Sequence, residues 1–251
     1  MEPVTLTADR LVLRPLGPHD ADAVHAAVQD PDIQRWTTIP SPYLPEHAAA
    51  FTAQTAPEGW ADGSMFTFGV FLRDTEAPGA APESGSEPDD ARSGSEPVDA
   101  RAGSEPVGAR AGGGTRASHA TTAPAEDATR ARNATDTALV GALSLTMRSL
   151  GTAEIGFWTA KEHRGRGYTT EATLTAVRWA FTRLAVDRVE WRAEVGNTAS
   201  RTVAAHAGFT LEGTLRSAIN NKGVRRDCWI GSLLPSDLGL PSTAPYLPAT
   251  A

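Results

Sequence analysis

Apolar and polar residues alternate in several short stretches of the chain and fall at helical spacing in others. The alternating stretches predict strands over residues 5–16, 65–72, 138–145, 152–160, 188–195, 209–215 and 224–234. Apolar residues three and four positions apart predict helices that begin near Pro18, near Pro45 and directly after Gly167. Strands and helices therefore interleave. This order predicts an α/β fold in which the strands on either side of the helix after Gly167 pair in parallel.

The alternating pattern stops between residues 74 and 137. This segment repeats a Gly-Ser-Glu-Pro sequence at a nine-residue spacing and has almost no large apolar side chain. Because it cannot bury enough apolar surface to form a core, we predict a disordered low-complexity insert at 74–137, within one domain formed by 1–73 and 138–234. A partner-binding segment is the alternative. Four prolines and little periodicity predict a poorly ordered tail over 235–251.

Charge and composition narrow the possible partners. The net charge is −7 at pH 7, and residues 75–137 hold 11 acidic and 6 basic side chains, so −7 minus −5 leaves −2 for the rest. An acidic chain argues against nucleic-acid binding, which favours a basic face. The single cysteine, Cys228, excludes an internal disulfide and suits a reducing compartment.

Other absences in the sequence set further expectations. No apolar run is long enough for a membrane span. We therefore expect a cytoplasmic protein without a membrane partner, either a monomer or a homodimer. The histidines are scattered singly, so we expect no metal site.

The most informative stretch is a glycine-rich turn between a predicted strand and a predicted helix. Residues 161–172 carry Gly165 and Gly167 in alternation with Arg164 and Arg166. The first amides of a helix have no partner inside it, and the helix dipole places about half a positive charge there. Glycines let an anion approach the backbone closely, and arginines add positive charge. The turn is therefore a candidate phosphate cradle. A tight turn with solvated arginines is the alternative.

Two motifs, in this order along the chain, resemble those of a known superfamily. Arg164-Gly-Arg-Gly-Tyr168, closely followed by Thr-Glu-Ala, resembles the acyl-CoA pyrophosphate loop of the GNAT superfamily of N-acetyltransferases. It is most similar to the branch that includes the ribosomal-protein N-terminal (alanine and serine) acetyltransferases. Asn197-Thr-Ala-Ser200, followed by Gly-Phe and Glu-Gly pairs, is similar to the closing cofactor motif of that branch. The superfamily pattern begins with Gln or Arg, where this chain has Glu162.

The resemblance implies a fold and a cofactor. The implied fold is a mixed, mostly antiparallel central sheet flanked by helices, with two strands splayed at the cofactor site. The implied cofactor is acetyl-CoA, as the acyl donor, with no metal. Gly156, inside the strand before the turn, suits the place where family members pair this strand with the pantetheine arm. The residues that the resemblance assigns to cofactor binding are Arg164, Gly165, Arg166, Gly167, Tyr168, Thr169 and Asn197.

The resemblance also suggests catalytic and acceptor-side residues. Ser200 would lie near the cofactor sulfur and protonate the departing thiolate, while Asn197 is in addition a favourable helix N-cap. Glu154 is the candidate general base, acting through water; an exposed strand carboxylate is the alternative. Trp36 falls in the region that lines the acceptor side, with a core anchor as the alternative. Some ribosomal-protein acetyltransferases have a glutamate shortly after the Glu-Gly pair, and counting places Ile219 there in this chain.

These motifs predict an acetyl-CoA-dependent N-acetyltransferase in which a primary amine attacks the thioester directly. An α-amine with a pKa near 7.8 costs about 1 kcal/mol to deprotonate at pH 7, whereas a lysine with a pKa near 10.4 costs about 4.6 kcal/mol. A site without a strong base therefore favours a protein N-terminus as the acceptor. Acetylation of a small amine, such as an antibiotic or a polyamine, is a second hypothesis. A non-catalytic acyl-CoA sensor or scaffold is a third.

Overall fold

The computed structural model describes residues 1–73, 136–149 and 151–248. Within these ranges one sheet has the strand order β1-β2-β3-β4-β5-β6-β8-β7. Its strands are β1 (Leu6–Thr7), β2 (Leu11–Arg14), β3 (Met65–Arg73), β4 (Asp136–Ser149), β5 (Thr152–Thr159), β6 (Arg188–Glu194), β7 (Thr210–Asn221) and β8 (Val224–Leu233). Every neighbouring pair is antiparallel except β5 with β6, which is parallel. The predicted mixed, mostly antiparallel sheet is confirmed. The predicted disordered insert lies outside the described residues, apart from the first two residues of β4.

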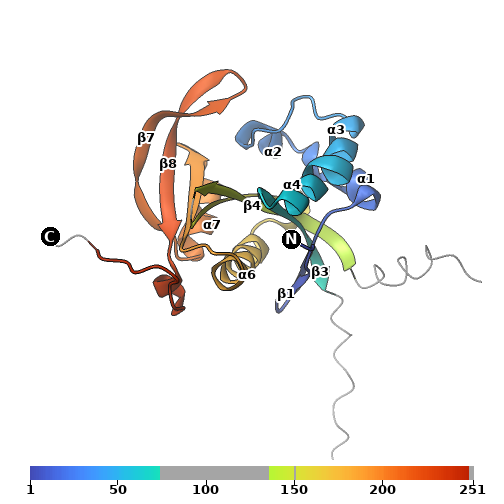
Figure 1. The fold of residues 1–251 in the computed structure, drawn as a ribbon. Coiled ribbons are helices and arrows are strands. Elements are labelled where there is room, and N and C mark those ends of the chain that lie inside the picture. Colours follow the sequence, from blue (N-terminus) through green and yellow to red (C-terminus); the bar gives the residue numbers. More distant parts are fainter. Residues whose placement is uncertain (74–135, 150, 249–251) are drawn as a thin grey trace, which may run out of the picture. The chain divides into compact units, whose positions relative to one another are not determined.

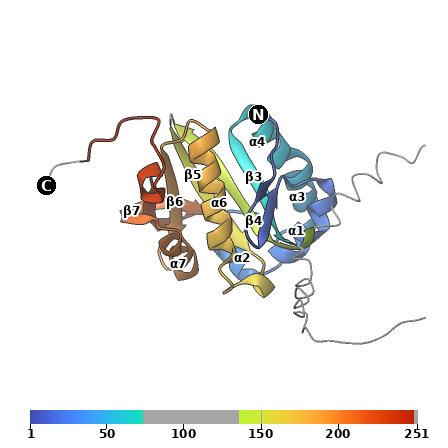
Figure 2. The ribbon, with the colours of Figure 1, turned by 90° about the horizontal axis from the view of Figure 1, so that it is seen from below.

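Helices cover both faces of this sheet (Figure 1). They are α1 (Ala21–Val28), α2 (Pro31–Trp36), α3 (Pro45–Ala50), α4 (Ala56–Asp62), α6 (Tyr168–Arg183) and α7 (Thr198–His206). Single turns η1 (Pro18–Asp20), η3 (Lys161–His163) and η4 (Pro235–Leu238) are 3-10 helices, and the π-helical turn η2 (Phe51–Thr55) joins α3 to α4. Helices α1 to α3 lie on one face and α6 on the other, where Figure 2 shows α6 crossing the central strands. No described helix is long and apolar enough to cross a membrane.

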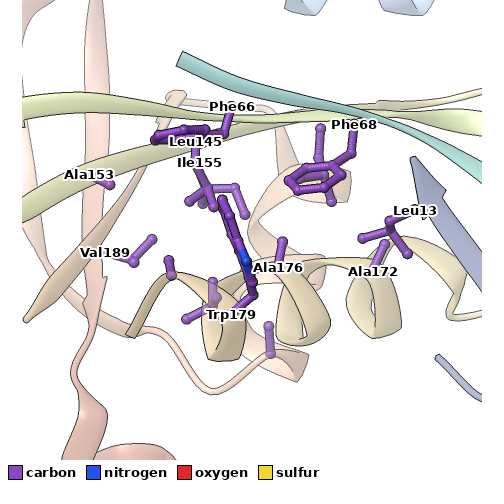
Figure 3. Packing of buried hydrophobic residues seen from close by; sticks show 14 of the residues in the cluster. Leu13, Phe66, Phe68, Leu145, Ala153, Ile155, Ala172, Ala176, Trp179 and Val189 are labelled. Carbon is purple, nitrogen blue, oxygen red and sulfur yellow. The ribbon is translucent and has the colours of Figure 1, made fainter. Parts of the chain in front are cut away.

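The core beneath α6 is built around aromatic side chains (Figure 3). Phe66 and Phe68 point to the same face of β3 because alternate residues of a strand share a face. Trp179 of α6 packs edge-on against both rings, with ring centroids 5.4 and 5.5 Å apart, and Trp60 of α4 completes the cluster. Small residues such as Ala176 let α6 lie close to the sheet. This packing positions the N-terminus of α6, where the glycine turn ends.

A second, smaller cluster holds α1, α2 and α3 on the opposite face. Its buried members are Leu16, Val24, Val28, Ile33, Tyr43, Ala48, Phe71 and Ala142. Ile33 is the buried residue of the short helix α2 and anchors this helix in the cluster.

The segment after β8 differs from its prediction. Prolines predict a poorly ordered tail over 235–251, but η4 forms at its start, and Leu238 and Leu240 pack against the core beneath α6. Farther along, Asp187 accepts hydrogen bonds from the Ser242 hydroxyl and from the backbone and side chain of Thr243. The Thr243 and Ser242 hydroxyl groups lower the pKa of Asp187. These contacts involve a residue from before β6, so no local pattern within the tail predicts them.

Candidate active site

Two parallel strands separate near the centre of the sheet. β5 pairs with β4 from Thr152 to Thr159, but with β6 only from Thr152 to Ile155. The last pair joins Ile155 to Trp191, and beyond it β5 continues to Thr159 and β6 to Glu194. The edge of β5 that faces β6 therefore carries backbone N–H and C=O groups that no neighbouring strand uses. This is the predicted splay.

Gly156 occupies the first position of β5 after the last pair. A Cβ atom built on this residue would meet no atom within 4 Å, so the space beside it is open. An extended chain can add to a free strand edge by main-chain hydrogen bonding, as peptides do. The glycine thus leaves the face of β5 open beside the free edge, where the two strands part.

The glycine turn leads from the end of β5 into α6. Gly165 and Gly167 have φ angles of +73° and +77°, in the left-handed region that favours glycine. Gly167 is the N-cap of α6, and no side chain caps this helix. The first amides of α6 are consequently available to an outside acceptor, at the positive end of the helix dipole. The backbone of the predicted phosphate cradle is present.

Arg10, from the chain segment before β2, holds this turn in place. Its backbone N–H and its Nε donate to the two oxygens of Glu171, at 2.8 and 2.7 Å, and its Nη1 donates to the Arg166 carbonyl at 3.0 Å. Its guanidinium also lies 4.7 Å from the ring centroid of Tyr168. This role of Arg10 was not predicted, because no spacing along the chain connects it to a turn more than 150 residues later.

Arg164 is engaged by carboxylates at the start of α2. Its guanidinium donates to Asp30 at 2.9 Å and to Asp32 at 3.2 Å, and its Nε donates to the Thr159 carbonyl at 3.2 Å. Asp30 is also the N-cap of α2, accepting from the Asp32 and Ile33 amides. Burial raises the pKa of Asp30, but Arg164 and the two amides outweigh it and hold that pKa below its ordinary value. The turn and the start of α2 are thereby tied together through two carboxylates, of which Asp30 is also the helix cap.

The other predicted cofactor residues near the turn face different ways. Thr169 shares a hydrogen bond with the Thr159 hydroxyl, so its side chain faces β5. Tyr168 packs under the Arg10 guanidinium. Arg166 is exposed, and among the described residues no ion pair engages its guanidinium. Of the two arginines in the motif, Arg166 is therefore the one whose charge is available to a bound anion.

The N-terminus of α7 lies beside the splay. Asn197 caps this helix, its side-chain oxygen accepting from the Ser200 amide at 3.1 Å, as predicted. The Ser200 hydroxyl oxygen accepts a hydrogen bond from the Trp191 indole N–H at 2.9 Å. Trp191 is the β6 residue of the last pair with β5. Its hydrogen bond therefore holds the Ser200 hydroxyl beside the point at which β5 and β6 part.

Glu154 lies on the face of β5 opposite the buried Ala153 and Ile155, which face the α6 core. It is engaged by two arginines. Arg148 Nε donates to its Oε2 at 3.1 Å, and Arg192 Nε lies 3.7 Å from the same oxygen. This predicted base is thus half-buried in an array of ion pairs rather than a free carboxylate.

The opposite end of the splay is closed by contacts between α2, β6 and the β7–β8 hairpin. Arg35 donates through both terminal nitrogens to Glu194, at 3.0 and 2.7 Å. The Asn221 side-chain amide donates to the Arg35 carbonyl and to Glu194, each at 3.1 Å. Trp36 lies against the turn that follows β6, since a Cβ on Gly196 would be 3.7 Å from its ring. We call Arg35, Glu194 and Asn221 the acceptor-side cluster, because the family resemblance leads us to expect the acceptor on this side.

The acceptor-side cluster contains a buried carboxylate, because Glu194 is only 6% exposed. Hydrogen bonding from Arg35 lowers its pKa, assisted by Asn221 and by the charge of Arg226, and this outweighs the effect of burial. In this region only Trp36 was predicted from the sequence, whereas Arg35, Glu194 and Asn221 were not. Glu194 sits in an alternating strand pattern in which a charged residue is expected to face solvent, so the sequence carried no signal of its burial.

The described part of the chain contains no candidate metal-binding site. No group of three or more His, Cys, Asp or Glu side chains there is placed to hold a metal ion. The ionisable groups at the splay are instead arginines and carboxylates in pairs.

The sequence pattern of a known family, the acetyltransferase (GNAT) domain, matches residues 10–94 and 114–210, which is more than half of the chain. The chain belongs to the GNAT acetyltransferase family. YdaF of Bacillus subtilis (strain 168) is 42% identical to this GNAT protein over 82 residues, which is 33% of this chain and 45% of YdaF. The chain spans about half the length of the curated relatives it matches.

Solved structures share the GNAT fold at low sequence identity. The ribosomal-protein-S5-alanine acetyltransferase from Vibrio fischeri superposes with a TM-score of 0.59 and 15% identity, over 92% of this chain and 96% of that one. The microcin C7 self-immunity acetyltransferase MccE, in complex with acetyl-CoA and AMP, superposes with a TM-score of 0.61 and 15% identity, over 90% of this chain and 93% of that one. The fold assignment therefore agrees with the family assignment.

Proposed function

We propose that this protein transfers an acetyl group from acetyl-CoA to a primary amine. The observation that carries the proposal is the continuity of the splay with the glycine turn. The free edge of β5 runs from Gly156 to Thr159, and the turn that follows leads to the uncapped N-terminus of α6 at Tyr168. A ligand with amide groups at one end and phosphates at the other matches this arrangement, and coenzyme A has both.

The residues present fit such a ligand. The free N–H and C=O groups of β5 after Ile155 would pair with the pantetheine amides. The α6 amides beyond Gly167 would bind the pyrophosphate, with Arg166 adding positive charge. The role of Arg164 in this proposal is indirect, because its guanidinium already binds Asp30 and Asp32. The acetyl-CoA bound in the MccE complex supports acetyl-CoA as the ligand of the present protein as well.

Bound acetyl-CoA supplies an activated acyl group, and the chain supplies positions for protons. Backbone N–H groups at the splay would stabilise the thioester carbonyl oxygen as negative charge develops on it. The Ser200 hydroxyl would donate its proton to the departing sulfur. The amine nitrogen loses one proton as the new C–N bond forms, through water toward Glu154 or to solvent. The overall exchange is balanced, since sulfur gains one proton and nitrogen loses one.

For the acceptor we propose the α-amine of a protein N-terminus. The support is the state of Glu154, which already contacts Arg148 and Arg192 and is poorly suited to act as a strong base. Deprotonating an α-amine at pH 7 costs about 1 kcal/mol, against about 4.6 kcal/mol for a lysine. The Vibrio fischeri enzyme is named for a protein acceptor, whereas MccE holds AMP. A small amine is therefore the second candidate, supported by that bound nucleotide.

Two measurements on the full chain test this function. Calorimetric titration with coenzyme A and acetyl-CoA measures binding, and thiol release measures turnover. The acceptors are a lysine-free peptide with a free N-terminus, an N-acetylated peptide of the same sequence with one added lysine, and a polyamine.

We expect binding of both cofactors, and thiol release with the first peptide alone. Release with only the polyamine would assign a small-molecule acceptor. Binding without release on any acceptor would support an acyl-CoA sensor, and an absence of binding would overturn the cofactor proposal itself.

A further inference from the structure

Ser200 is held at two points, through its backbone amide and through its hydroxyl. The Ser200 amide donates to Asn197, which fixes the first turn of α7. The Trp191 indole N–H donates to the Ser200 oxygen at 2.9 Å. Indole nitrogen is a donor only, so in this contact the hydroxyl must act as the acceptor. Trp191 is 2% exposed and paired in β6, so its ring has little freedom to move.

Among the described residues, no group accepts the proton of this hydroxyl. In the described helices, Thr175 and Thr182 of α6 and Thr202 of α7 each donate their hydroxyl to the carbonyl four residues earlier. Such back-bonding is the common local outcome for a helical hydroxyl. Ser200 makes no such bond, and among the described residues the Trp191 indole is the only hydrogen-bonding partner of its oxygen. Its O–H is therefore free to point at a ligand in the splay.

We propose that Trp191 is a positioning residue that directs the Ser200 proton toward the sulfur of the bound thioester. This inference rests on the proposed function, because it concerns the same departing thiolate. A hydroxyl that accepts a hydrogen bond is polarised and becomes a better donor, so the indole both orients and strengthens the acid. In the proton balance, Ser200 gives its hydroxyl proton to sulfur and regains one from solvent, while the amine proton leaves through water toward Glu154 or to solvent.

A structural explanation also accounts for the contact. A buried indole N–H normally finds a hydrogen-bond partner, and Ser200 could serve only to satisfy it. The two explanations differ in what happens to the chemical step when the N–H alone is removed. If Ser200 only satisfies the indole, the loss alters stability and leaves the rate of acyl transfer unchanged.

The test is a double-mutant cycle with Trp191→Phe and Ser200→Ala in the full chain. We expect Trp191→Phe to lower kcat by roughly threefold to tenfold, the effect of losing one ordinary hydrogen bond in the transition state. The KM for acetyl-CoA should stay within about twofold. The double variant should be no slower than Ser200→Ala alone, because the indole acts through that hydroxyl.

Trp229→Phe is the matched control. Trp229 lies on β8 opposite Ala193, contacts Arg201, and donates to no hydroxyl among the described residues. It should leave kcat within about twofold, since no proton donor changes. If Trp191→Phe does not fold, benzothienylalanine at position 191 replaces the N–H by sulfur and keeps the shape of the indole.

A second readout uses the acetyl selenoester of coenzyme A as the donor. A selenolate departs readily without a proton, so the losses in kcat caused by Trp191→Phe and Ser200→Ala should both shrink. A merely structural role for Trp191 would give the same loss with both donors.

The outcomes separate this inference from the proposed function. A wild-type kcat for Trp191→Phe, or losses that add fully with those of Ser200→Ala, would overturn the role of Trp191 and leave acetyl transfer intact. A wild-type kcat for Ser200→Ala would overturn the role of Ser200 as the acid, and the role of Trp191 with it. Absence of any acetyl transfer by the unaltered protein would contradict the proposed function first.

Discussion

The glycine turn and the acceptor-side cluster lie at two ends of the same splay, but they are built in different ways. The turn is local, since its conformation follows from Gly165 and Gly167 and from the start of α6 directly after them. The acceptor-side cluster joins α2, the end of β6 and the hairpin, whose residues are far apart in the chain. A backbone cradle can be encoded by adjacent residues, whereas a buried charge needs partners that only folding provides.

The two regions are also connected. Asp30 caps α2 and binds Arg164, so the first turn of α2 reaches the glycine turn. The last turn of α2 carries Arg35, which reaches Glu194. One short helix thus contacts both ends of the splay. We therefore predict that substitutions in the turn alter the Kd for coenzyme A, and that substitutions in the acceptor-side cluster alter the acceptor KM.

The largest effect is expected from a methyl group in the turn. Gly165→Ala places a side chain in a left-handed conformation, at a cost of roughly 1–2 kcal/mol, and in the space proposed for the pyrophosphate. We expect the Kd for coenzyme A to rise by about tenfold or more, since 1.4 kcal/mol of lost binding is a factor of ten. Calorimetric titration measures this change.

Gly223→Ala is the control for the turn variant. Gly223 has a φ of +82° in the β7–β8 turn, and a Cβ on either glycine would meet no atom within 4 Å. Both variants should therefore lose similar stability in chemical denaturation, and only Gly165→Ala should lose affinity for coenzyme A. Equal affinities in the two variants would contradict the proposed pyrophosphate site.

The next effect is expected from the acceptor-side cluster. Arg35→Ala removes the main partner of buried Glu194. Breaking a fully buried pair costs about 3–5 kcal/mol, but the Arg35 side chain is 45% exposed, so we expect about 1–2 kcal/mol. The acceptor KM should rise, while the Kd for coenzyme A should stay within about twofold.

Arg183→Ala, at the exposed end of α6, is the control for Arg35→Ala. It removes the same charge from a site without a buried carboxylate, and surface changes of this kind alter stability by about 0.5 kcal/mol or less. A raised Kd for coenzyme A in Arg35→Ala alone would show that the two regions do not act separately.

The stabilisation from Arg35 should depend on pH. Because Arg35 holds the pKa of Glu194 below its ordinary value, the unfolded chain binds the proton more tightly than the folded chain. The contribution is therefore fully present above the unfolded pKa of about 4.3, and is lost as pH falls through the lower folded pKa. Urea unfolding of the wild type and of Arg35→Ala should differ most at pH 7 and converge in acid. A difference that grows in acid would contradict this assignment.

The smallest effect, a small loss of stability, is expected where α2 contacts the glycine turn. Asp30→Asn keeps a side chain that caps the helix and loses only the ion pair with Arg164, so we expect a loss of a few tenths of a kcal/mol. Asp30→Ala loses the cap as well, and about 1 kcal/mol is expected. Thermal unfolding of the two variants compares these losses. Equal losses would show that the ion pair, and not the cap, holds the first turn of α2.

Several parts of the fold and site could be predicted because their cause is local. Alternation predicted the strands of the central sheet, and three-and-four spacing predicted α6. The Asn197 cap was visible as a polar residue at the start of a helix, and its bond to Ser200 confirms it. The splay of β5 and β6 was predicted from the family resemblance, because no pattern in the residues indicates it.

Other contacts could not be predicted, because their partners are remote. Trp191 reads in the sequence as one apolar residue of an alternating strand, yet its indole N–H binds Ser200 across the start of α7. Arg164 reads as part of an anion site, yet its guanidinium binds the N-cap of α2. In both cases the polar group of the side chain binds a residue of another element. Which element packs nearby is set by the fold.

Periodicity and left-handed glycines act over a few residues, so the primary structure is enough to set the order of strands and helices and the conformation of the glycine turn. The folded arrangement is needed to know which charges are buried, which arginine remains available to an anion, and where the Ser200 hydroxyl is held. Those properties depend on desolvation and on the distances between segments, and both exist only once the chain has folded.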